Sequence, residues 1–203
     1  MLGRMTQRAF VAIYVLMILN LAFWLFSLIG LFILGIGPAL RTITEVFLNH
    51  KFEYHNYHFK EMWQIYKKYF WIANGHFYSF FGIELFLFYD LYLTSQIKNM
   101  WMLPVIFLLV FVMITLTVVG IYTLIIESTF DVEFKNAVKL AFVAFFSDFK
   151  DLLKFIAGLV VIGALTKFWP GFLLFLTVST IIVWGAFSSK KWIGAIIDQL
   201  EAD

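Results

Sequence analysis

Long apolar segments with charged residues gathered at their ends are the feature that most limits how this chain can fold. Four such segments are evident directly, at residues 71–93, 101–126, 152–168 and 171–187. A helix of about 20 apolar residues crosses roughly 30 Å of hydrocarbon. The chain is 63% hydrophobic and 14% charged, whereas ordinary soluble domains are about a quarter charged. The sequence therefore predicts an all-α protein, a polytopic transmembrane helix bundle embedded in the lipid bilayer of the plasma membrane.

The same composition argues against several classes of function. The net charge of +2 is small and the basic residues lie at the ends of apolar segments, so nucleic acid is not expected as a partner. The chain has no cysteine, and the spacing of His50, His55 and His58 around Glu53 matches no compact metal motif. No nucleophile elbow, phosphate-binding loop or zinc-protease motif is present in the sequence. We therefore expect a protein that is not an enzyme and needs neither metal nor cofactor.

The N-terminal segment, 9–40, is too long to be one upright span, because as a single helix it would measure about 48 Å. Two arrangements remain. In one, a single span is followed by a short surface helix. In the other, 9–29 and 31–48 form a hairpin of two passages. Gly30, Gly35, Gly37 and Pro38 are the candidate positions for the break. Proline is well tolerated in the first turn of a helix, which favours Gly37-Pro38 among them.

The distribution of lysine and arginine favours the hairpin, because these residues collect at the cytoplasmic ends of membrane helices. With the N-terminus inside, only Lys98 and Lys167 lie outside. Apart from Arg41, the remaining basic residues then face the cytoplasm: Arg4, Arg8, Lys51, Lys60, Lys67, Lys68, Lys135, Lys139, Lys150, Lys154, Lys190 and Lys191. We therefore predict six membrane passages with both termini in the cytoplasm.

Two stretches, 58–71 and 133–149, place apolar side chains on one helical face and lysines on the other. We expect both to be interfacial helices on the cytoplasmic side, with a third, short helix after the last span. The cytoplasmic contacts are expected from Trp63, Tyr66, Lys67, Lys68, Phe134 and Phe142. The chain is then one membrane domain, 1–203, with a possible weak repeat of 9–97 and 98–188. Ordinary interfacial connectors would give the same pattern.

A few polar residues inside the apolar segments are the candidate functional residues. Arg41 and Glu45 lie one helical turn apart in the second segment, Asn20 is in the first, and His76 and Glu84 are in the third. A charge at bilayer depth costs roughly 2.5–3.5 kcal/mol, so such groups face protein or water. The residues line a polar pathway, face a partner subunit or form buried structural pairs. Glu84 is either a proton or cation site or a partner of Arg41. Asn20 is expected to hydrogen-bond a neighbouring helix.

Small residues in the later segments predict close contacts between helices, because glycine lets two backbones approach. The residues concerned are Gly75, Gly82, Gly158 and Gly163.

Three stretches of the chain resemble a known family. They are "NLAFW" in the first segment, "GIGPALRTITEVF" in the second, and "FKEMWQIYKKYF" in the first amphipathic stretch. Over nearly its whole length the chain resembles the YesL-like small membrane proteins of Gram-positive bacteria, and Gly37-Pro38-Ala39 is the most specific of the matching motifs. Members of that family tend to have small residues after this motif, so Arg41 and Thr42 are departures from the pattern.

The resemblance implies a function that the spacing of residues does not show. Members of the family are often encoded beside carbohydrate ABC importers and their glycan-degrading enzymes. This implies an accessory role in sugar uptake, with other membrane subunits of the importer as partners. The chain lacks the Glu-Ala-Ala loop typical of importer permeases, so it is not expected to be the permease itself. The alternative is a small stand-alone transporter or channel that uses the polar residues as its pathway.

Overall fold

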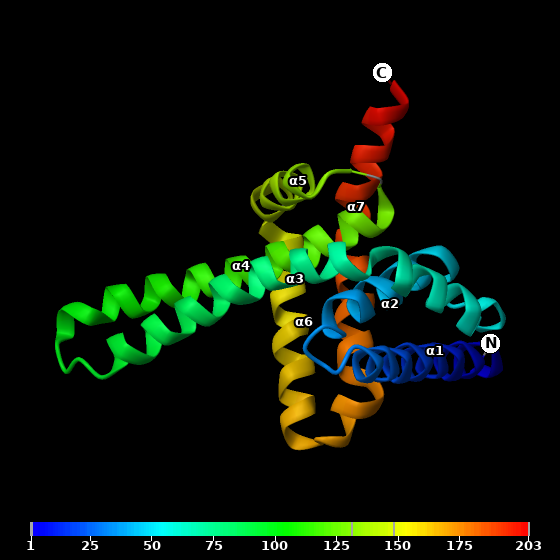
Figure 1. The fold of residues 1–203 in the computed structure, drawn as a ribbon, viewed down its shortest axis with the longest axis horizontal. Helices are drawn as coiled ribbons and strands as arrows, with labels where there is room; N and C mark the ends of the chain where they lie inside the picture. The colour runs from blue at the N-terminus through cyan, green and yellow to red at the C-terminus, as the bar shows by residue number, and fades with distance from the viewer. Residues whose placement is uncertain (1, 131, 148, 203) are drawn as a thin grey trace.

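A computed structural model describes the backbone of residues 2–130, 132–147 and 149–202, and the side chains of 6–130, 132–147 and 149–194. Within these residues the chain forms seven α-helices and no strand, which confirms the predicted all-α class (Figure 1). The helices are α1 (Leu2–Ile29), α2 (Ile36–His50), α3 (Phe59–Ser95), α4 (Leu103–Thr129), α5 (Phe134–Ser147), α6 (Phe149–Phe168) and α7 (Val178–Ala202). Short 3-10 turns at Tyr54–Asn56 and Met100–Met102 and a π-helical segment at Leu173–Thr177 complete the regular structure.

Three of the described helical segments are long and apolar enough to cross a membrane: Thr6–Ile29, Met100–Thr129 and Leu173–Gly194. The predicted segments 71–93 and 152–168 are helical but are not among these three. The first carries acidic and amide side chains inside α3, and the second has lysines at both ends of α6. The helix α2 has 15 residues, which gives a length of about 22 Å. The protein is thus consistent with membrane insertion through several apolar helices.

The chain reverses direction between α1 and α2, as a hairpin requires, and the break lies at the candidates Gly30 and Gly35 rather than at Gly37 and Pro38. It occupies residues 30–35, where Leu31 and Phe32 have positive φ angles of 56° and 61°. Gly30 and Gly35 approach so closely that a Cβ atom added to Gly30 would lie 2.3 Å from the Gly35 Cα. Pro38 instead lies within the first turn of α2, where a missing amide donor costs no helical hydrogen bond.

The predicted interfacial helices differ in how they join the rest of the chain. The stretch 58–71 is not a separate helix, because it runs directly into the next segment as α3, which has 37 residues. The stretch after the last span is likewise part of α7, which continues to Ala202. The side chains of this C-terminal stretch from Ala195 onward lie outside the described residues. Only α5 is a helix of its own, and this difference distinguishes the two halves of the possible repeat.

Helix α5 packs on α4 through part of its predicted apolar face. Ala137, Ala141 and Phe145 are buried against α4. Phe142, which was expected on that face, is 41% exposed. Small alanines bring the two helices close together, and the larger Phe142 is left on the surface of α5.

Two clusters of buried apolar residues form the body of the molecule. The first joins α1, α2, the start of α3 and α7, with Val15, Phe26 and Ile43 at its centre. The second joins α4, α5 and α6 around Tyr122 and Phe155. Close contacts of α4 with both α2 and α7 connect the two clusters.

The predicted glycine contacts are found at one of the four positions. A Cβ atom at Gly158 would lie 2.0 Å from the indole nitrogen of Trp184, so this glycine lets α6 pack closely against α7. A Cβ atom at Gly75, Gly82 or Gly163 would have no neighbour within 4 Å. The spacing of glycines therefore did not distinguish a helix contact from an exposed helix surface.

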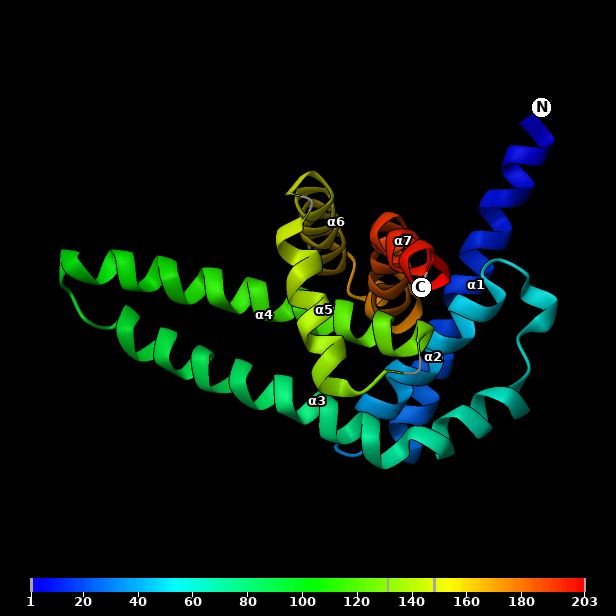
Figure 2. The same cartoon turned by 90° about the horizontal axis from the view of Figure 1, so that it is seen from above.

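The hairpin of α3 and α4 extends far beyond the body as a two-helix projection (Figures 1 and 2). We call residues 85–114 the arm. No residue between 75 and 114 is buried. The hairpin of α6 and α7 runs across the direction of the arm, so the two hairpins diverge from the body rather than lie parallel. This arrangement differs from the simple bundle expected from the sequence.

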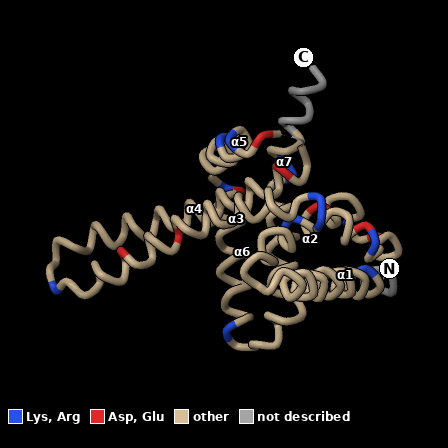
Figure 3. The backbone as a smooth tube through the Cα atoms, viewed as in Figure 1, with Lys and Arg blue, Asp and Glu red and all other residues tan. Residues whose placement is uncertain are grey.

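Charged residues are concentrated around the body (Figure 3). Lys98 lies in the loop at the tip of the arm, and Lys167 lies in the last turn of α6, near the tip of the other hairpin. These are the two lysines that the topology prediction places outside.

Candidate functional site: a buried ion cluster beside an apolar cavity

Arg41 lies on α2 and is 8% exposed. Its Nε donates to Glu45 Oε2 at 3.1 Å, one turn along the same helix. Its Nη2 donates to the backbone carbonyl oxygen of Glu127, and its Nη1 is 3.8 Å from Glu127 Oε2. The ring of Tyr69 lies under the guanidinium, with 4.4 Å from Cζ to the ring centroid. The arginine is thus enclosed by protein groups from α2, α3 and α4.

Glu127 extends this arrangement to His76. The Oε1 atom of Glu127 is 2.8 Å from His76 Nδ1, an ion pair whenever the imidazole is protonated. The His76 ring stacks on Phe134 at the start of α5, with 3.9 Å between centroids and 11° between planes. We call Arg41, Glu45, His76 and Glu127 the ion cluster. It joins three helices at the point where α2 meets the α3/α4 hairpin.

The ion cluster places two carboxylates around one guanidinium. With a neutral His76 its formal charge is −1, and with a protonated His76 it is zero. Charges removed from water are tolerated only when they are paired and hydrogen-bonded, and the contacts above supply those partners. Nearby on α2, the hydroxyl of Thr42 donates to the Pro38 carbonyl oxygen, as expected for a hydroxyl inside an apolar helix.

A cavity of about 340 Å³ lies beside the ion cluster, between α2, α3, α4 and α7. Its walls are mostly apolar and aromatic. Glu84 lines the cavity on α3, two turns beyond His76, and Thr117 Oγ1 lies 2.7 Å from Glu84 Oε1. Three of the five predicted polar residues (Arg41, His76 and Glu84) therefore line one cavity, and a fourth, Glu45, pairs with Arg41 beside it.

The predicted pairing of Glu84 with Arg41 is not found among the described residues. Arg41 pairs with Glu45 and Glu127 instead. Sequence reasoning did not select Glu127 as a site residue, because it lies at the end of an apolar segment where a solvated carboxylate is ordinary. Its position 86 residues from Arg41 leaves no local periodicity that links the two.

The fifth predicted polar residue, Asn20, serves a different part of the molecule. Its Nδ2 donates to the Leu173 carbonyl oxygen at 2.9 Å, and its Oδ1 accepts the Ser179 amide proton at 3.0 Å. Trp24 Nε1 also donates to the Leu173 carbonyl oxygen. Asn20 therefore bridges the π-helical segment at the start of the last helix, which confirms that it hydrogen-bonds a neighbouring helix.

The residues predicted to make cytoplasmic contacts are divided between the body and the surface. Tyr66 is 3% exposed, stacks on Phe26, and donates its hydroxyl to the Phe26 carbonyl oxygen. Trp63 stacks in the same group of rings. Lys67 and Lys68 are exposed, with their ammonium groups near the rings of Trp63 and Tyr69. The two aromatics thus contribute to folding, whereas the lysines face outward.

The histidine-rich loop contains a local polar network. His50 Nε2 is 2.9 Å from Glu61 Oε2, and the Tyr57 hydroxyl donates to the Lys51 carbonyl oxygen. Burial, followed by the negative charge of Glu61, raises the pKa of Tyr57 above its ordinary value. Among the residues that the structure describes, no three histidine, aspartate or glutamate side chains are grouped as a metal site.

Comparison with known proteins gives one partial match. Residues 16–91 match the sequence profile of a family described as "Protein of unknown function, DUF624". This range covers the second half of α1, all of α2 and α3 as far as residue 91, so it includes Arg41, His76 and Glu84 but not Glu127. No curated protein matches the chain. No solved structure matches it either.

Proposed function

We propose that the protein is a non-enzymatic membrane accessory subunit whose arm packs against the membrane helices of a carbohydrate ABC importer permease and so assists sugar uptake. The observation that carries this proposal is the arm itself. It projects from the body as two apolar helices, and no residue between 75 and 114 is buried within the chain.

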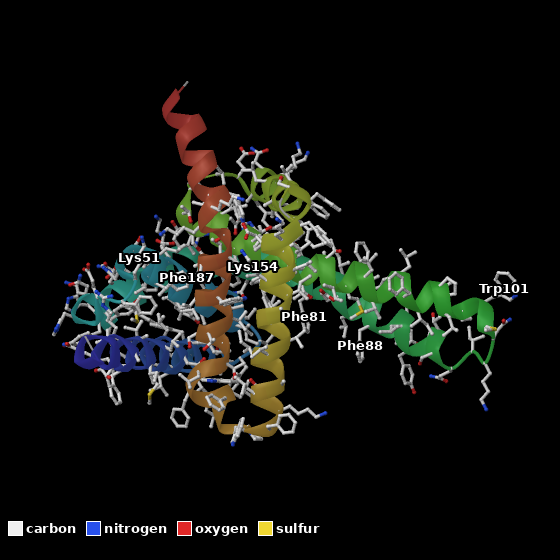
Figure 4. The ribbon with its side chains drawn as sticks, turned by 180° about the vertical axis from the view of Figure 1, so that it is seen from behind. Lys51, Phe81, Phe88, Trp101, Lys154 and Phe187 are labelled. Atoms are coloured by element: carbon white, nitrogen blue, oxygen red, sulfur yellow. The ribbon has the colours of Figure 1, made fainter. Side chains whose placement is uncertain are left out.

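The surface of the arm suits a helical partner. Its exposed side chains are large and often aromatic, for example Phe86 at 63% and Phe107 at 75% exposure. Figure 4 shows Phe81 at the base of this projection and Phe88 and Trp101 farther along it. Aromatic residues are enriched where protein surfaces pack together, and a large unpartnered apolar surface marks a protein or membrane contact. The identity of the partner is supported by the sequence resemblance to the YesL-like proteins.

A six-passage topology with both termini in the cytoplasm is part of this proposal. It places Lys98 and Lys167 outside, and Asn56, in the loop before α3, inside. Because the chain has no cysteine, single cysteine variants need no altered background. In intact cells, an impermeant thiol reagent should label Lys98→Cys and leave Asn56→Cys unlabelled until the membrane is permeabilised. Labelling of Asn56→Cys in intact cells would exclude the topology.

The partner is tested by purification of a tagged full-length chain from native membranes after mild solubilisation. The expected result is that permease subunits of a sugar importer are recovered with it. The double variant Phe86→Ala/Phe107→Ala should reduce that recovery. Leu21→Ala/Leu25→Ala is the matched control, because these leucines are exposed on α1, outside the arm. Recovery of the protein alone, together with solute flux in liposomes, would overturn the accessory role.

A stand-alone transporter or channel is the second candidate, and the cavity with its ion cluster favours it. In that case Glu84 and Arg41 would line the pathway, so Glu84→Gln or Arg41→Ala would abolish transport in liposomes. Unchanged solute uptake in properly inserted variants would remove this candidate.

A further inference from the structure

The cavity beside the ion cluster contains a buried hydroxyl without a partner. Thr123 lies on α4, lines the cavity and is 1% exposed, and its Oγ1 makes no hydrogen bond among the described residues. The other serine and threonine side chains of α4 have partners. Thr115, Ser128 and Thr129 each donate to the carbonyl oxygen four residues earlier in the helix, and Thr117 lies within hydrogen-bond distance of Glu84. A buried unpaired hydroxyl costs about 1–3 kcal/mol, so Thr123 has a hydrogen-bonding group that no described residue satisfies.

A carboxylate without a cationic partner lies farther along the same cavity. Glu84 accepts a hydrogen bond from the neutral Thr117, but no ion pair joins it to a basic group in the described part of the chain. Arg41 is already held by Glu45 and Glu127 and is not available. The cavity therefore has an excess of negative charge at the Glu84 end.

The walls between these polar groups are apolar and aromatic. Rings from α3 and from the start of α5 line the cavity: Tyr69, Phe77, Phe80, Phe81 and Phe134. Aromatic faces attract cations and are used to bind ammonium groups. A sugar would leave many hydroxyl groups unpaired against such walls, and unpaired polar groups are strongly disfavoured. The volume of about 340 Å³ falls at the lower end of small-molecule sites.

The distance between Thr117 and Thr123 along α4 indicates the length of a ligand that could reach both ends of the cavity. Thr117, which contacts Glu84, and Thr123 are six residues apart, which corresponds to a rise of about 9 Å. We propose that the cavity binds an organic amine with an apolar or aromatic body. The ammonium group binds at Glu84, the body lies among the aromatic rings, and a hydrogen-bonding group at the far end meets the Thr123 hydroxyl. This site does not depend on the accessory role, because binding is measured on the isolated chain.

Three compounds of nearly equal size test this arrangement. Tyramine has both an ammonium group and a distal hydroxyl, 2-phenylethylamine lacks the hydroxyl, and 4-hydroxyphenylethanol lacks the charge. Binding to the full-length protein is measured by calorimetry in nanodiscs of phosphatidylglycerol, with empty nanodiscs as the reference. Tyramine should bind saturably, the uncharged compound at least tenfold more weakly, and the compound without the hydroxyl about threefold more weakly. Binding of tyramine no greater than to empty nanodiscs, or equal binding of tyramine and the uncharged compound, would overturn the proposal.

Isosteric variants assign the two ends of the ligand. Glu84→Gln should remove the preference for tyramine over the uncharged compound, and Thr123→Val should remove its preference over 2-phenylethylamine. Asp90→Asn is the matched control, because Asp90 lies on the same helix beyond the cavity-lining residues. Each variant must first match the parent in monodispersity and thermal unfolding. Unchanged preferences in a folded Glu84→Gln protein would contradict the assignment.

The ammonium group has two sources, a soluble amine or the headgroup of an aminophospholipid. Nanodiscs that contain phosphatidylethanolamine distinguish them. If the lipid supplies the ammonium group, tyramine binds more weakly in these nanodiscs than in phosphatidylglycerol alone, and Glu84→Gln removes that difference. If the ligand is a soluble amine, the affinity is the same in both.

Discussion

The body and the arm both contain strongly apolar helices, yet the two regions are organised in different ways. In the body, rings and aliphatic side chains from several helices form two buried clusters, and an ion cluster ties α2, α3 and α4 together. In the arm, two helices contact each other and leave their outer surfaces uncovered. In the most apolar window of Met100–Thr129, 11% of the residues are buried, against 33% for Thr6–Ile29.

This comparison shows that hydrophobicity and internal packing are separate properties in a membrane protein. Lipid tails are as apolar as leucine, so the hydrophobic effect does not by itself drive helices together inside the bilayer. Small residues, hydrogen bonds and buried charges determine which helices associate. The body has all three, at Gly158, Asn20 and Arg41, whereas the arm offers aromatic side chains for a contact outside the chain.

The largest effect is expected from the ion cluster. Arg41→Leu leaves Glu45 and Glu127 buried without their shared cation, and removal of one partner from a buried pair typically costs about 3–5 kcal/mol. Thermal unfolding in detergent, followed by tryptophan fluorescence, should show a marked loss of stability. Lys98→Ala, at the exposed tip of the arm, is the control and should unfold like the parent. Equal stability of the two variants would mean that the ion cluster does not hold the body together.

A smaller effect is expected where α6 packs against α7. Gly158→Ala places a Cβ atom against the Trp184 ring, and overpacking of this kind costs about 1–3 kcal/mol. Gly163→Ala, on the same helix with nothing within 4 Å of the added atom, should be neutral or slightly stabilising, because alanine favours a helix more than glycine does. The two variants are compared by thermal unfolding, and a reversed order would contradict the packing described for this hairpin.

The bridge made by Asn20 should contribute somewhat less. Asn20→Leu removes the two hydrogen bonds to the π-helical segment and its neighbour, and such interactions between membrane helices are worth about 1–2 kcal/mol. Hydrogen exchange of the Ser179 amide should accelerate more than that of amides in α4. Trp24→Phe, which removes one bond to Leu173 and keeps the Asn20 bridge, serves as the control. Unaltered exchange at Ser179 would show that the bridge is dispensable.

The smallest effect on stability is expected in the arm. Phe88→Ala removes a side chain that is 59% exposed, and exposed substitutions usually change the free energy of unfolding by less than about 0.5 kcal/mol. The purified variant should unfold like the parent, while its recovery with partner subunits falls. A large loss of stability in the isolated protein would mean that the arm packs against its own chain.

The sequence predicted the class of the fold and much of the site, but not their spatial arrangement. The apolar segments, the reversal after α1 and the polar candidates on α2 and α3 follow from composition and local periodicity. Gly30 and Gly35 were candidate positions for the break, but Gly37-Pro38 was favoured over them, because the positive φ angles of Leu31 and Phe32 have no signature in their residue types. Glu127 was missed because a long-range ion pair has no local pattern.

Local sequence patterns also could not show that α3 and α7 are each one continuous helix. An amphipathic stretch that leads into a span is compatible either with a bend between two helices or with one straight helix. For α3, contacts with α1 and α2 favour one straight helix, because Tyr66 packs against Phe26 inside the body.

The most direct test of the account is photo-crosslinking from the arm in the native membrane. A photoreactive amino acid placed at Phe88 is compared with the same amino acid at Leu25 of α1, and the crosslinked products are identified by mass spectrometry. The account predicts a crosslink from position 88 to a membrane-spanning subunit of a sugar importer, and none to that subunit from position 25. Crosslinking of position 88 to lipid alone, in membranes that contain the importer, would contradict it.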